Sequence, residues 1–301
     1  MQNLLSIDVT LRDGGNRINF AFSEHDLAII LPSLDSSGVE YIEIGYRNGA
    51  IRPLPNLGPA GLCARTYVLM CAKLIRHAKM AVMGHPENIA IADLLELQNC
   101  GVSLFRVCVT KHNLESACAV IRAGKQLGLT ISANIIHVSQ YHDNSLQKSV
   151  EQLLSCAPDM LYFADSNGSL SPQRVTAICK KYSGQFGFPL GFHAHDNIGL
   201  AQANALAAIE AGAAYIDFSL AGFGKGGGNL KTELFCAYLH SQKVHKYNLA
   251  PLLEAANFVR SRFKTEHDAL EMDELLRGIL DLSTAEVKAK LFSAQVEKAD
   301  A

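Results

Sequence analysis

Short apolar segments alternate with longer amphipathic segments along most of the chain. The short segments are apolar on both faces, which is typical of parallel strands that are covered by helices. The predicted strands are 4–9, 40–44, 79–83, 104–109, 130–137, 159–164, 190–194 and 214–219. The helical patterns between them occupy 24–36, 65–77, 87–99, 114–127, 145–155, 172–182, 199–211 and 231–242. This alternation predicts an α/β fold with a parallel sheet.

Eight successive strand–helix units favour closure into a (β/α)8 TIM barrel, which typically needs about 250 residues. After residue 244 the pattern changes to helical segments without a strand, at 249–264, 266–280 and 283–297. We therefore expect a catalytic barrel domain over residues 1–244 and a short C-terminal helical extension over residues 245–301.

Composition narrows the class of protein. The length of 301 residues fits one barrel with a short addition, although two ordinary domains would also fit. A net charge of -2 gives no basic field that attracts nucleic acid or anionic lipid. No apolar run reaches the roughly 18 residues of a membrane span, and the first residues read as a strand rather than a signal peptide. We expect a cytoplasmic protein with neither nucleic acid nor a membrane as partner.

The eight cysteines form no C-x-x-C pair and lie mostly in apolar surroundings. In a cytoplasmic protein this usage predicts buried, reduced thiols rather than a disulfide framework.

Polar residues follow nearly every predicted strand, where a TIM barrel carries its active site. They are Arg12 and Asp13 after the first strand, Arg47 after the second, Arg106 on the fourth, Asn134, His137 and Tyr141 on or after the fifth, Asp165 after the sixth, His193 and His195 on the seventh, and Lys225 and Asn229 after the eighth. We expect these side chains to meet at one rim of the barrel.

His193 and His195 carry the strongest single signal. Residues two apart in a strand point to the same side, so both imidazoles project into the barrel mouth. Asp13 ends the first strand, which a closed barrel places one strand away from the seventh. Two histidines and a carboxylate suit Mn2+, Fe2+, Co2+ or Zn2+ with positions left open for a substrate. The alternative is a pair of hydrogen-bonded rim histidines without metal, and the nearby Asp13 and Asn229 favour the metal site.

Other rim residues allow two interpretations each. Arg12 either stabilises the negative charge of an enolate or forms a structural salt bridge. Lys225 lies in the glycine-dense stretch 222–229, which we interpret as a mobile loop, and either binds an anion or faces solvent. Asp165 either orients a ligand or caps the next turn.

Three stretches resemble the DRE-TIM metallolyases. Residues 10–14, TLRDG, resemble their opening motif, and 192–213, FHAHDNIGLAQANALAAIEAGA, resemble the metal motif of their seventh strand. Residues 219–233, SLAGFGKGGGNLKTE, resemble their loop after the eighth strand. Within this HMGL-like superfamily the likeness is greatest to the 4-hydroxy-2-oxovalerate aldolases. The Claisen-type synthases usually have Gly-Glu-Arg where this chain has Gly-Lys-Gly at 224–226, and hydroxymethylglutaryl-CoA lyases have a loop cysteine that is missing here.

The resemblance implies an aldolase that joins a 2-oxo acid such as pyruvate to an aldehyde, or cleaves the product. It implies Asp13, His193 and His195 as metal ligands, and Asn229 matches an asparagine that ligates metal in some members. Arg12 would stabilise the enolate. We expect a divalent cation, with Mn2+ first and Mg2+, Co2+ or Zn2+ as alternatives.

Two positions depart from the family pattern. Asn16 stands where typical oxovalerate aldolases have a catalytic histidine, and asparagine cannot act as a general base. Either another group transfers the proton or the reaction differs. We assign proton transfer to His137 and Tyr141, with Asp165 as a weaker candidate. The Tyr46-Arg47 pair replaces the usual Gly-His, and Arg47 suits an anionic substrate. We assign substrate binding to Arg47, Arg106, Asn134, Asp165 and Lys225.

Two other functions remain open. The first is an acyl-CoA-dependent condensing enzyme, and the sequence of the last loop argues against it. The second is a non-catalytic metal-binding barrel, for which Asn16 is the main support. The C-terminal part is shorter than the communication domain of typical aldolases. We therefore expect a homodimer through the helical tail rather than pairing with a dehydrogenase.

Overall fold

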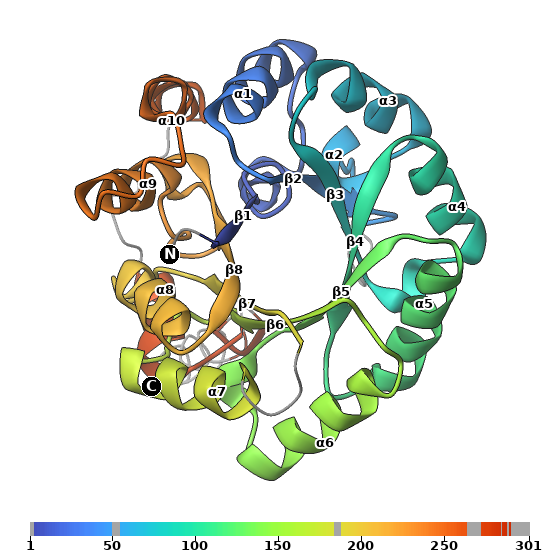
Figure 1. The fold of residues 1–301 in the computed structure, drawn as a ribbon, viewed down its shortest axis with the longest axis vertical. Helices are drawn as coiled ribbons and strands as arrows, with labels where there is room; N and C mark the ends of the chain where they lie inside the picture. Colours follow the sequence, from blue (N-terminus) through green and yellow to red (C-terminus); the bar gives the residue numbers. More distant parts are fainter. Residues whose placement is uncertain are drawn as a thin grey trace, which may run out of the picture.

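Eight parallel strands close into a barrel in chain order (Figure 1). The computed structural model describes residues 3–49, 55–183, 188–263, 272–283, 285–287 and 289. The strands are β1 Leu5–Asp8, β2 Tyr41–Arg47, β3 Lys79–Gly84, β4 Val102–Val109, β5 Thr130–Ile135, β6 Met160–Asp165, β7 Leu190–Ala194 and β8 Ala213–Phe218. Closure is complete because β1 pairs with both β2 and β8. The predicted TIM barrel is confirmed.

Helices surround the barrel on its outer side (Figure 1). They are α1 Glu24–Ser37, α2 Pro59–Leu62, α3 Arg65–Leu74, α4 Ile91–Asn99, α5 Leu114–Gln126, α6 Asp143–Leu154, α7 Pro172–Ser183, α8 Ala201–Glu210 and α9 Thr232–Ser241. Short 3-10 turns lie at Gly14–Arg17, Pro86–Asn88, Val138–Gln140 and Leu220–Gly222. The periodic pattern predicted the eight long helices, but α2 and the 3-10 turns are too short to show a period.

Two layers fill the inside of the barrel. The lower layer is apolar and includes Ile7, Tyr41 and Leu104. Inward-facing residues recur at every second position of a strand, so Glu43 on β2 and Arg106 on β4 stand one layer higher. Both are fully buried, as is Asp217 on β8. A charged layer therefore separates the apolar floor from the mouth of the barrel.

The C-terminal extension packs directly on the barrel. Helix α10, Leu249–Phe263, lies beside α1 and α9 in the outer ring (Figure 1). Helix α11, Met272–Leu280, reaches the rim, where Arg277 donates a hydrogen bond to the carbonyl of Ser166 at 2.9 Å. These helices confirm the predicted helical character of 249–264 and of the later part of 266–280. Residues 266–271 and most of 283–297 lie outside the described residues, and the boundary after residue 244 stays a prediction.

One pair of cysteines differs from the expectation of free thiols. The structure joins Cys118 on α5 to Cys156, just after α6, in a disulfide with Cα atoms 5.7 Å apart. The two helices are neighbours in the outer ring, and a separation of 38 residues carries no sequence signal of pairing. The other six cysteines are free and buried, as expected.

None of the helices within the described ranges has the length and apolar character needed to cross a membrane.

A buried carboxylate joins β1 to α9. Asp8 accepts hydrogen bonds from the backbone N–H and the hydroxyl of Thr10, and from the hydroxyl of Thr232 at 3.4 Å. Burial raises the pKa of Asp8 to about 7. The folded protein therefore binds a proton at this position more tightly than the unfolded chain does.

Replacing Asp8 should stabilise the fold at alkaline pH. A raised folded pKa contributes stability below the unfolded pKa of about 4, and this contribution is lost as pH rises through about 7. Asp8→Asn keeps an oxygen acceptor without the charge. We expect its advantage in unfolding free energy to grow from below about 1 kcal/mol near pH 4.5 to about 2–4 kcal/mol at pH 8, measured by urea denaturation. The exposed Asp143→Asn serves as control, and a pH-independent difference for Asp8→Asn would contradict the assignment.

Candidate active site

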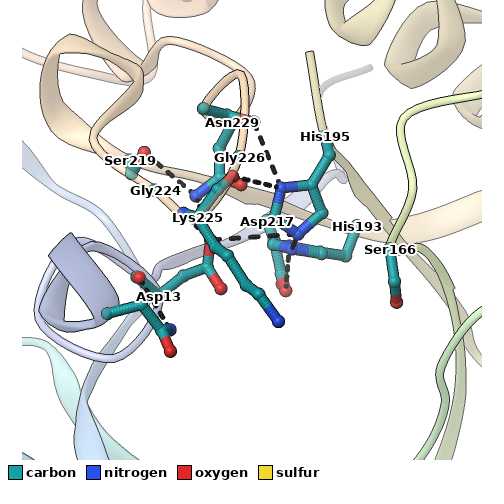
Figure 2. Close-up of polar contacts among 12 residues, drawn as sticks. Asp13, Ser166, His193, His195, Asp217, Ser219, Gly224, Lys225, Gly226 and Asn229 are labelled. Atoms are coloured by element: carbon teal, nitrogen blue, oxygen red, sulfur yellow. Dashed lines mark hydrogen bonds and ion pairs between the residues drawn. The ribbon is translucent and has the colours of Figure 1, made fainter. Parts of the chain in front are cut away.

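Three side chains predicted as metal ligands meet at the carboxyl-terminal rim of the barrel. Asp13 follows β1, His193 lies in β7, and His195 follows directly (Figure 2). Their ligand atoms all lie within 4.8 Å of one another, and all three residues are buried. The i, i+2 spacing of the histidines and the closure of β8 onto β1 produce this grouping.

The hydrogen bonds behind the two imidazoles determine which nitrogen carries the proton. His195 Nδ1 lies 3.0 Å from the carbonyl oxygen of Lys225 and 3.2 Å from that of Gly228. Carbonyl oxygens only accept, so Nδ1 is the protonated nitrogen and Nε2 has a free lone pair. His193 Nδ1 lies at an ion-pair distance of 3.1 Å from the Asp217 carboxylate, and this charge favours the proton on Nδ1.

This arrangement leaves two lone pairs facing each other. The Nε2 atoms of His193 and His195 are 3.2 Å apart, and the Asp13 carboxylate lies 3.9 Å from the Nε2 of His195. Three electron-rich groups at this separation repel one another unless a cation lies between them. Nitrogen and oxygen donors of this kind, each with an oriented partner behind it, fit a divalent transition metal.

Asn229 adds a fourth candidate ligand. Its Nδ2 donates to Asp13 Oδ2 at 2.9 Å, whereas its Oδ1 is buried without a hydrogen-bond donor. A buried unsatisfied oxygen costs about 1–3 kcal/mol, which coordination to a cation would remove. The amide also needs a glycine beside it, because a Cβ on Gly224 would lie 2.3 Å from Asn229 Nδ2. The predicted grouping of Asn229 with the other three residues is thus present in the structure.

The charge states of the cluster favour metal binding. Burial lowers the pKa of His195 to about 3, so this imidazole is neutral at pH 7. Burial also opposes the charge of Asp13, but the electrostatic interactions with His195 and then Arg12 outweigh it and lower the pKa of Asp13 overall. A carboxylate beside the neutral imidazole of His195 is a protonation state in which such side chains coordinate metals.

A continuous network of buried ion pairs supports the ligands from below. Arg12 contacts Asp13 Oδ1 at 2.8 Å and Glu43 Oε2 at 2.7 Å. Arg106 contacts the same Glu43 oxygen at 3.0 Å and Asp217 Oδ2 at 2.8 Å. Because Asp217 in turn orients His193, the network connects the ligand on β1 with the ligand on β7. Both ends of the cluster are thereby fixed by residues in the barrel interior.

Glu43 and Asp217 are the network members that sequence reasoning missed. The predicted strands 40–44 and 214–219 contain them, and single acidic residues inside apolar strands were not interpreted. Both could have been predicted as members of ion pairs, because a carboxylate at an inward-facing position of a buried strand requires a partner of opposite charge.

Four of the five predicted substrate-binding residues have protein partners instead. Arg106 is fully buried in the network, and the Asn134 amide, with its oxygen turned toward Arg106, accepts from it at 2.8 Å. Arg47 pairs with Asp93 and Glu96 of α4 and donates to the carbonyl of Cys63. Asp165 accepts from the backbone N–H groups of Ser169 and Leu170, which is the capping alternative, and burial raises its pKa to about 6. Direct substrate contact by these four residues stays a prediction.

Lys225 is the fifth of these residues, and it lies on the loop after β8. Its backbone N–H donates to Asp13 Oδ2 at 3.1 Å, and its side chain extends from the loop into the mouth (Figure 2). Arg17 ties the loop to the first rim segment by donating to the carbonyls of Gly224, at 2.7 Å, and Gly226. Contacts with Asp13 and with Arg17 therefore hold this loop at two points.

His137 and Tyr141 lie on the β5 side of the mouth. His137 has a positive φ of 52°, and its Nδ1 lies 3.0 Å from Asn167 Oδ1. Burial lowers the pKa of His137 below its ordinary value of 6.5, so the ring is neutral at pH 7. The Tyr141 hydroxyl is buried without a hydrogen-bond partner, and burial raises its pKa to about 12. Tyr141 is thus available as a hydrogen-bond donor but not as a phenolate at neutral pH.

His85 is a rim residue that sequence reasoning overlooked. It directly follows β3, and its ring stacks on Tyr46 with the centroids 5.5 Å apart. Its Nδ1 is buried without a partner, and burial lowers the pKa of His85 to about 4. The rule that identified the other rim residues, a polar side chain directly after a predicted strand, would have found it.

Comparison with known proteins decides the family. A family model described as HMGL-like matches residues 3–259. The chain belongs to the HMGL-like family. This result confirms the resemblance that the motifs at 10–14, 192–213 and 219–233 indicated.

Relatives of this HMGL-like chain agree with that assignment, and a solved structure shares its fold. It is 32% identical over 279 residues to 4-hydroxy-2-oxovalerate aldolase 2 of Nocardia farcinica, which covers 90% of this chain and 79% of that one. It is 28% identical over 233 residues to an oxaloacetate decarboxylase of Mycobacterium tuberculosis, covering 77% and 69%. The N-terminal domain of a candidate aldolase from Bacteroides vulgatus has the same fold, with a TM-score of 0.84, 24% identity, and coverage of 98% and 100%.

Removing one ligand should weaken metal binding selectively. We expect His195→Gln to lower the Mn2+ affinity of this HMGL-like protein by at least about 10- to 100-fold in a calorimetric titration, because replacing even an outer partner of a ligand has that effect. His85→Gln is the matched control, since it removes a half-buried histidine from the same mouth outside the cluster. Equal losses in the two variants would contradict the assignment of the site.

Proposed function

We propose that the protein is a divalent-metal-dependent aldolase, a lyase that forms or cleaves a carbon–carbon bond between a 2-oxo acid enolate, such as that of pyruvate, and an aldehyde. The observation that carries the proposal is the pair of facing imidazole lone pairs beside Asp13, with the Arg12 guanidinium bonded to the same carboxylate. The aldolase names of the relatives, at about a third identity, support the same reaction class.

Asp13, His193, His195 and Asn229 are the proposed metal ligands. We propose Mn2+ as the cation, with Co2+, Zn2+ or Mg2+ as alternatives, because imidazole ligands lean away from Mg2+. When bound, such a cation supplies a Lewis acid that polarises the carbonyl of the 2-oxo acid.

Arg12 stabilises the enolate. Its guanidinium is fixed by Asp13 on one side and Glu43 on the other, and it lies 5.8 Å from the centre of the Tyr46 ring. A positive group that is already oriented needs no rearrangement when negative charge develops on the enolate oxygen. Both sequence interpretations of Arg12 therefore apply together, since the structural salt bridge is what orients the charge.

His137 moves the proton of the 4-hydroxyl group. In the cleavage direction, its Nε2 takes that proton, the C3–C4 bond breaks, the aldehyde leaves, and the electron pair forms the enolate. The ring suits this role because it is neutral at pH 7 and its Nδ1 is already hydrogen-bonded. Tyr141 donates a hydrogen bond on the same side of the mouth. A base in the segment after β5 thereby takes the role of the histidine that Asn16 replaces.

Substrate recognition divides between the loop and the interior. We propose that the Lys225 ammonium binds the carboxylate of the 2-oxo acid from the loop. Arg106, Asn134, Arg47 and Asp165 act through the protein contacts described above, which keep the rim in place. Small molecules are then the substrates, and the net charge of -2 gives no basic field that would attract nucleic acid.

We also propose a cytoplasmic homodimer. Exposed apolar side chains on the extension and the adjoining helix, Leu234, Leu253 and Ile279, support a contact between two copies. We do not propose a dehydrogenase partner.

The relative named oxaloacetate decarboxylase favours one second reaction. Decarboxylation of oxaloacetate and cleavage of a 4-hydroxy-2-oxo acid both release the enolate of pyruvate, so the same Arg12 stabilises the product of either reaction. The two reactions differ only in the group that leaves, carbon dioxide or an aldehyde. Acyl-CoA condensation and a non-catalytic barrel have no comparable support in the mouth.

Enolate formation is the first reaction to test. Pyruvate in D2O with Mn2+ should lose its methyl proton signal in NMR in the presence of the enzyme. Arg12→Lys keeps the charge but loses the planar fork, and we expect at least about 100-fold slower exchange from it. Asp13→Ala should abolish exchange. Near-normal exchange in both variants would refute the site, and exchange only with a CoA thioester would favour the condensing reaction.

Bond cleavage tests His137 separately. With a 4-hydroxy-2-oxo acid as substrate, His137→Gln should lower kcat by about 100-fold or more, the usual contribution of a general base. In the wild type, kcat/KM should rise with pH and level off below pH 6.5, because the active form is neutral and burial lowers the pKa of His137. Tyr141→Phe should lower kcat less. The reverse order of the two variants would transfer the role to Tyr141.

A further inference from the structure

Asp281, the residue after α11, lies over the ends of β5 and β6. Its Oδ1 accepts hydrogen bonds from Ser139 Oγ at 2.6 Å, Asn167 Nδ2 at 2.8 Å and Ser169 Oγ at 2.8 Å. Its backbone carbonyl accepts from the side chain of Gln140 at 2.8 Å. A single residue of the C-terminal extension thus collects donors from two rim loops, and one of these donors touches His137.

Two other contacts hold α11 against the rim. Arg277 is buried and donates to the carbonyl of Ser166, whose hydroxyl accepts from the backbone N–H of His137 at 2.9 Å. Gly278 allows the close approach, since a Cβ there would lie 2.4 Å from Ile198. Asp281 is therefore placed by an anchored helix end and not by its own hydrogen bonds alone.

The Asn167 amide connects Asp281 to His137. The side chain is fully buried, and it presents its Nδ2 to Asp281 and its Oδ1 to His137 Nδ1. A carboxylate can only accept, so the NH2 end of the amide must face Asp281. The carbonyl end then faces His137 and accepts a hydrogen bond, which requires the proton on Nδ1. Nε2 is left with its lone pair, and no described residue hydrogen-bonds it.

Without Asp281, the orientation of the Asn167 amide would no longer be fixed. The oxygen and the NH2 group of an amide are nearly equal in size, so Asn167 can reverse at little steric cost. The NH2 group would then face His137 Nδ1 and stabilise the tautomer with the proton on Nε2. That tautomer has no lone pair on Nε2 to accept a proton from a substrate.

We propose that Asp281 is a positioning residue that fixes the Asn167 amide and thereby holds His137 in the Nδ1–H tautomer. The proposal rests on the proposed function in one respect, namely the assignment of His137 as the base. It makes the C-terminal extension a working part of the barrel's active site. The segment acts on the chemistry through two hydrogen bonds, without touching the substrate.

The test reads the tautomer directly. Protein labelled with [15N]histidine is examined by NMR at pH 8, where His137 is neutral, and its signals are assigned by their loss in His137→Gln. We expect the wild type to carry the proton on Nδ1 and Asp281→Ala to shift the proton toward Nε2. Asp281→Asn keeps an oxygen acceptor at the Oδ1 position and should restore the wild-type pattern. Asn167→Ala should match Asp281→Ala, and it provides a second measurement if that variant does not fold.

Catalysis and metal binding supply the companion readouts. Asp281→Ala should lower kcat for cleavage of a 4-hydroxy-2-oxo acid by at least about 10-fold, as loss of the correct histidine tautomer does elsewhere. Mn2+ affinity should stay at the wild-type level, because the ligand cluster is separate. The matched control is the double variant Ser139→Ala with Ser169→Ala, which removes two other donors to Asp281 but leaves the Asn167 contact. It should keep the Nδ1–H tautomer.

The outcomes separate this inference from the proposed function. If Asp281→Ala and Asn167→Ala both keep the proton on Nδ1, the inference is overturned whatever the activity. If the control double variant changes the tautomer as much as Asp281→Ala does, general docking of α11 is responsible and the inference is again overturned. If the tautomer changes in Asp281→Ala but kcat does not, the positioning role is supported and the assignment of His137 as the base fails.

Discussion

The buried contact between Arg106 and its two carboxylates, Glu43 and Asp217, is the interaction on which the mouth of the barrel depends. A guanidinium with no solvent exposure is tolerated only with charged partners, and the two acids come from β2 and β8. Each acid then orients a residue of the site, because Glu43 contacts Arg12 and Asp217 contacts His193. The position of the reactive groups is therefore set one layer below them, by ion pairs in the barrel interior.

The rim adds a second set of constraints from segments far apart in the sequence. Arg17, after β1, fixes the loop of Lys225 after β8, and Asp281, after α11, fixes Asn167 after β6. In each case the charged side chain fixes which end of its partner group faces it. A carbonyl must turn its oxygen toward a guanidinium, and an amide must turn its NH2 group toward a carboxylate. The barrel thus supplies the frame, and these long-range contacts supply the orientation of single polar groups.

The sequence predicted the barrel, the long helices and the Asp13, His193 and His195 cluster because these features depend on local period and on strand ends. It assigned Arg106 and Arg47 to the substrate and did not predict their ion pairs, since a rim position says nothing of the partner across the barrel. Direct substrate contact by either residue stays a prediction. Their partners, Glu43 on β2 and Asp93 on α4, are distant in sequence, and no spacing connects them. His85 differs from these residues, because it is a polar residue directly after a predicted strand and its position alone was enough to predict it. The role of Asp281 was out of reach, since it requires knowing which way an amide points.

The buried charges of this network do not cancel. Asp13, Glu43 and Asp217 give three negative charges, and Arg12 and Arg106 give two positive charges, so these five buried groups sum to one negative charge. A divalent cation changes that sum to one positive charge, and the carboxylate of a 2-oxo acid brings it to zero. Buried ion pairs contribute little to stability by themselves, because desolvation offsets their attraction. Under the proposed function, their value in this barrel lies in the remaining imbalance, which would favour a divalent cation first and a monoanionic substrate after it.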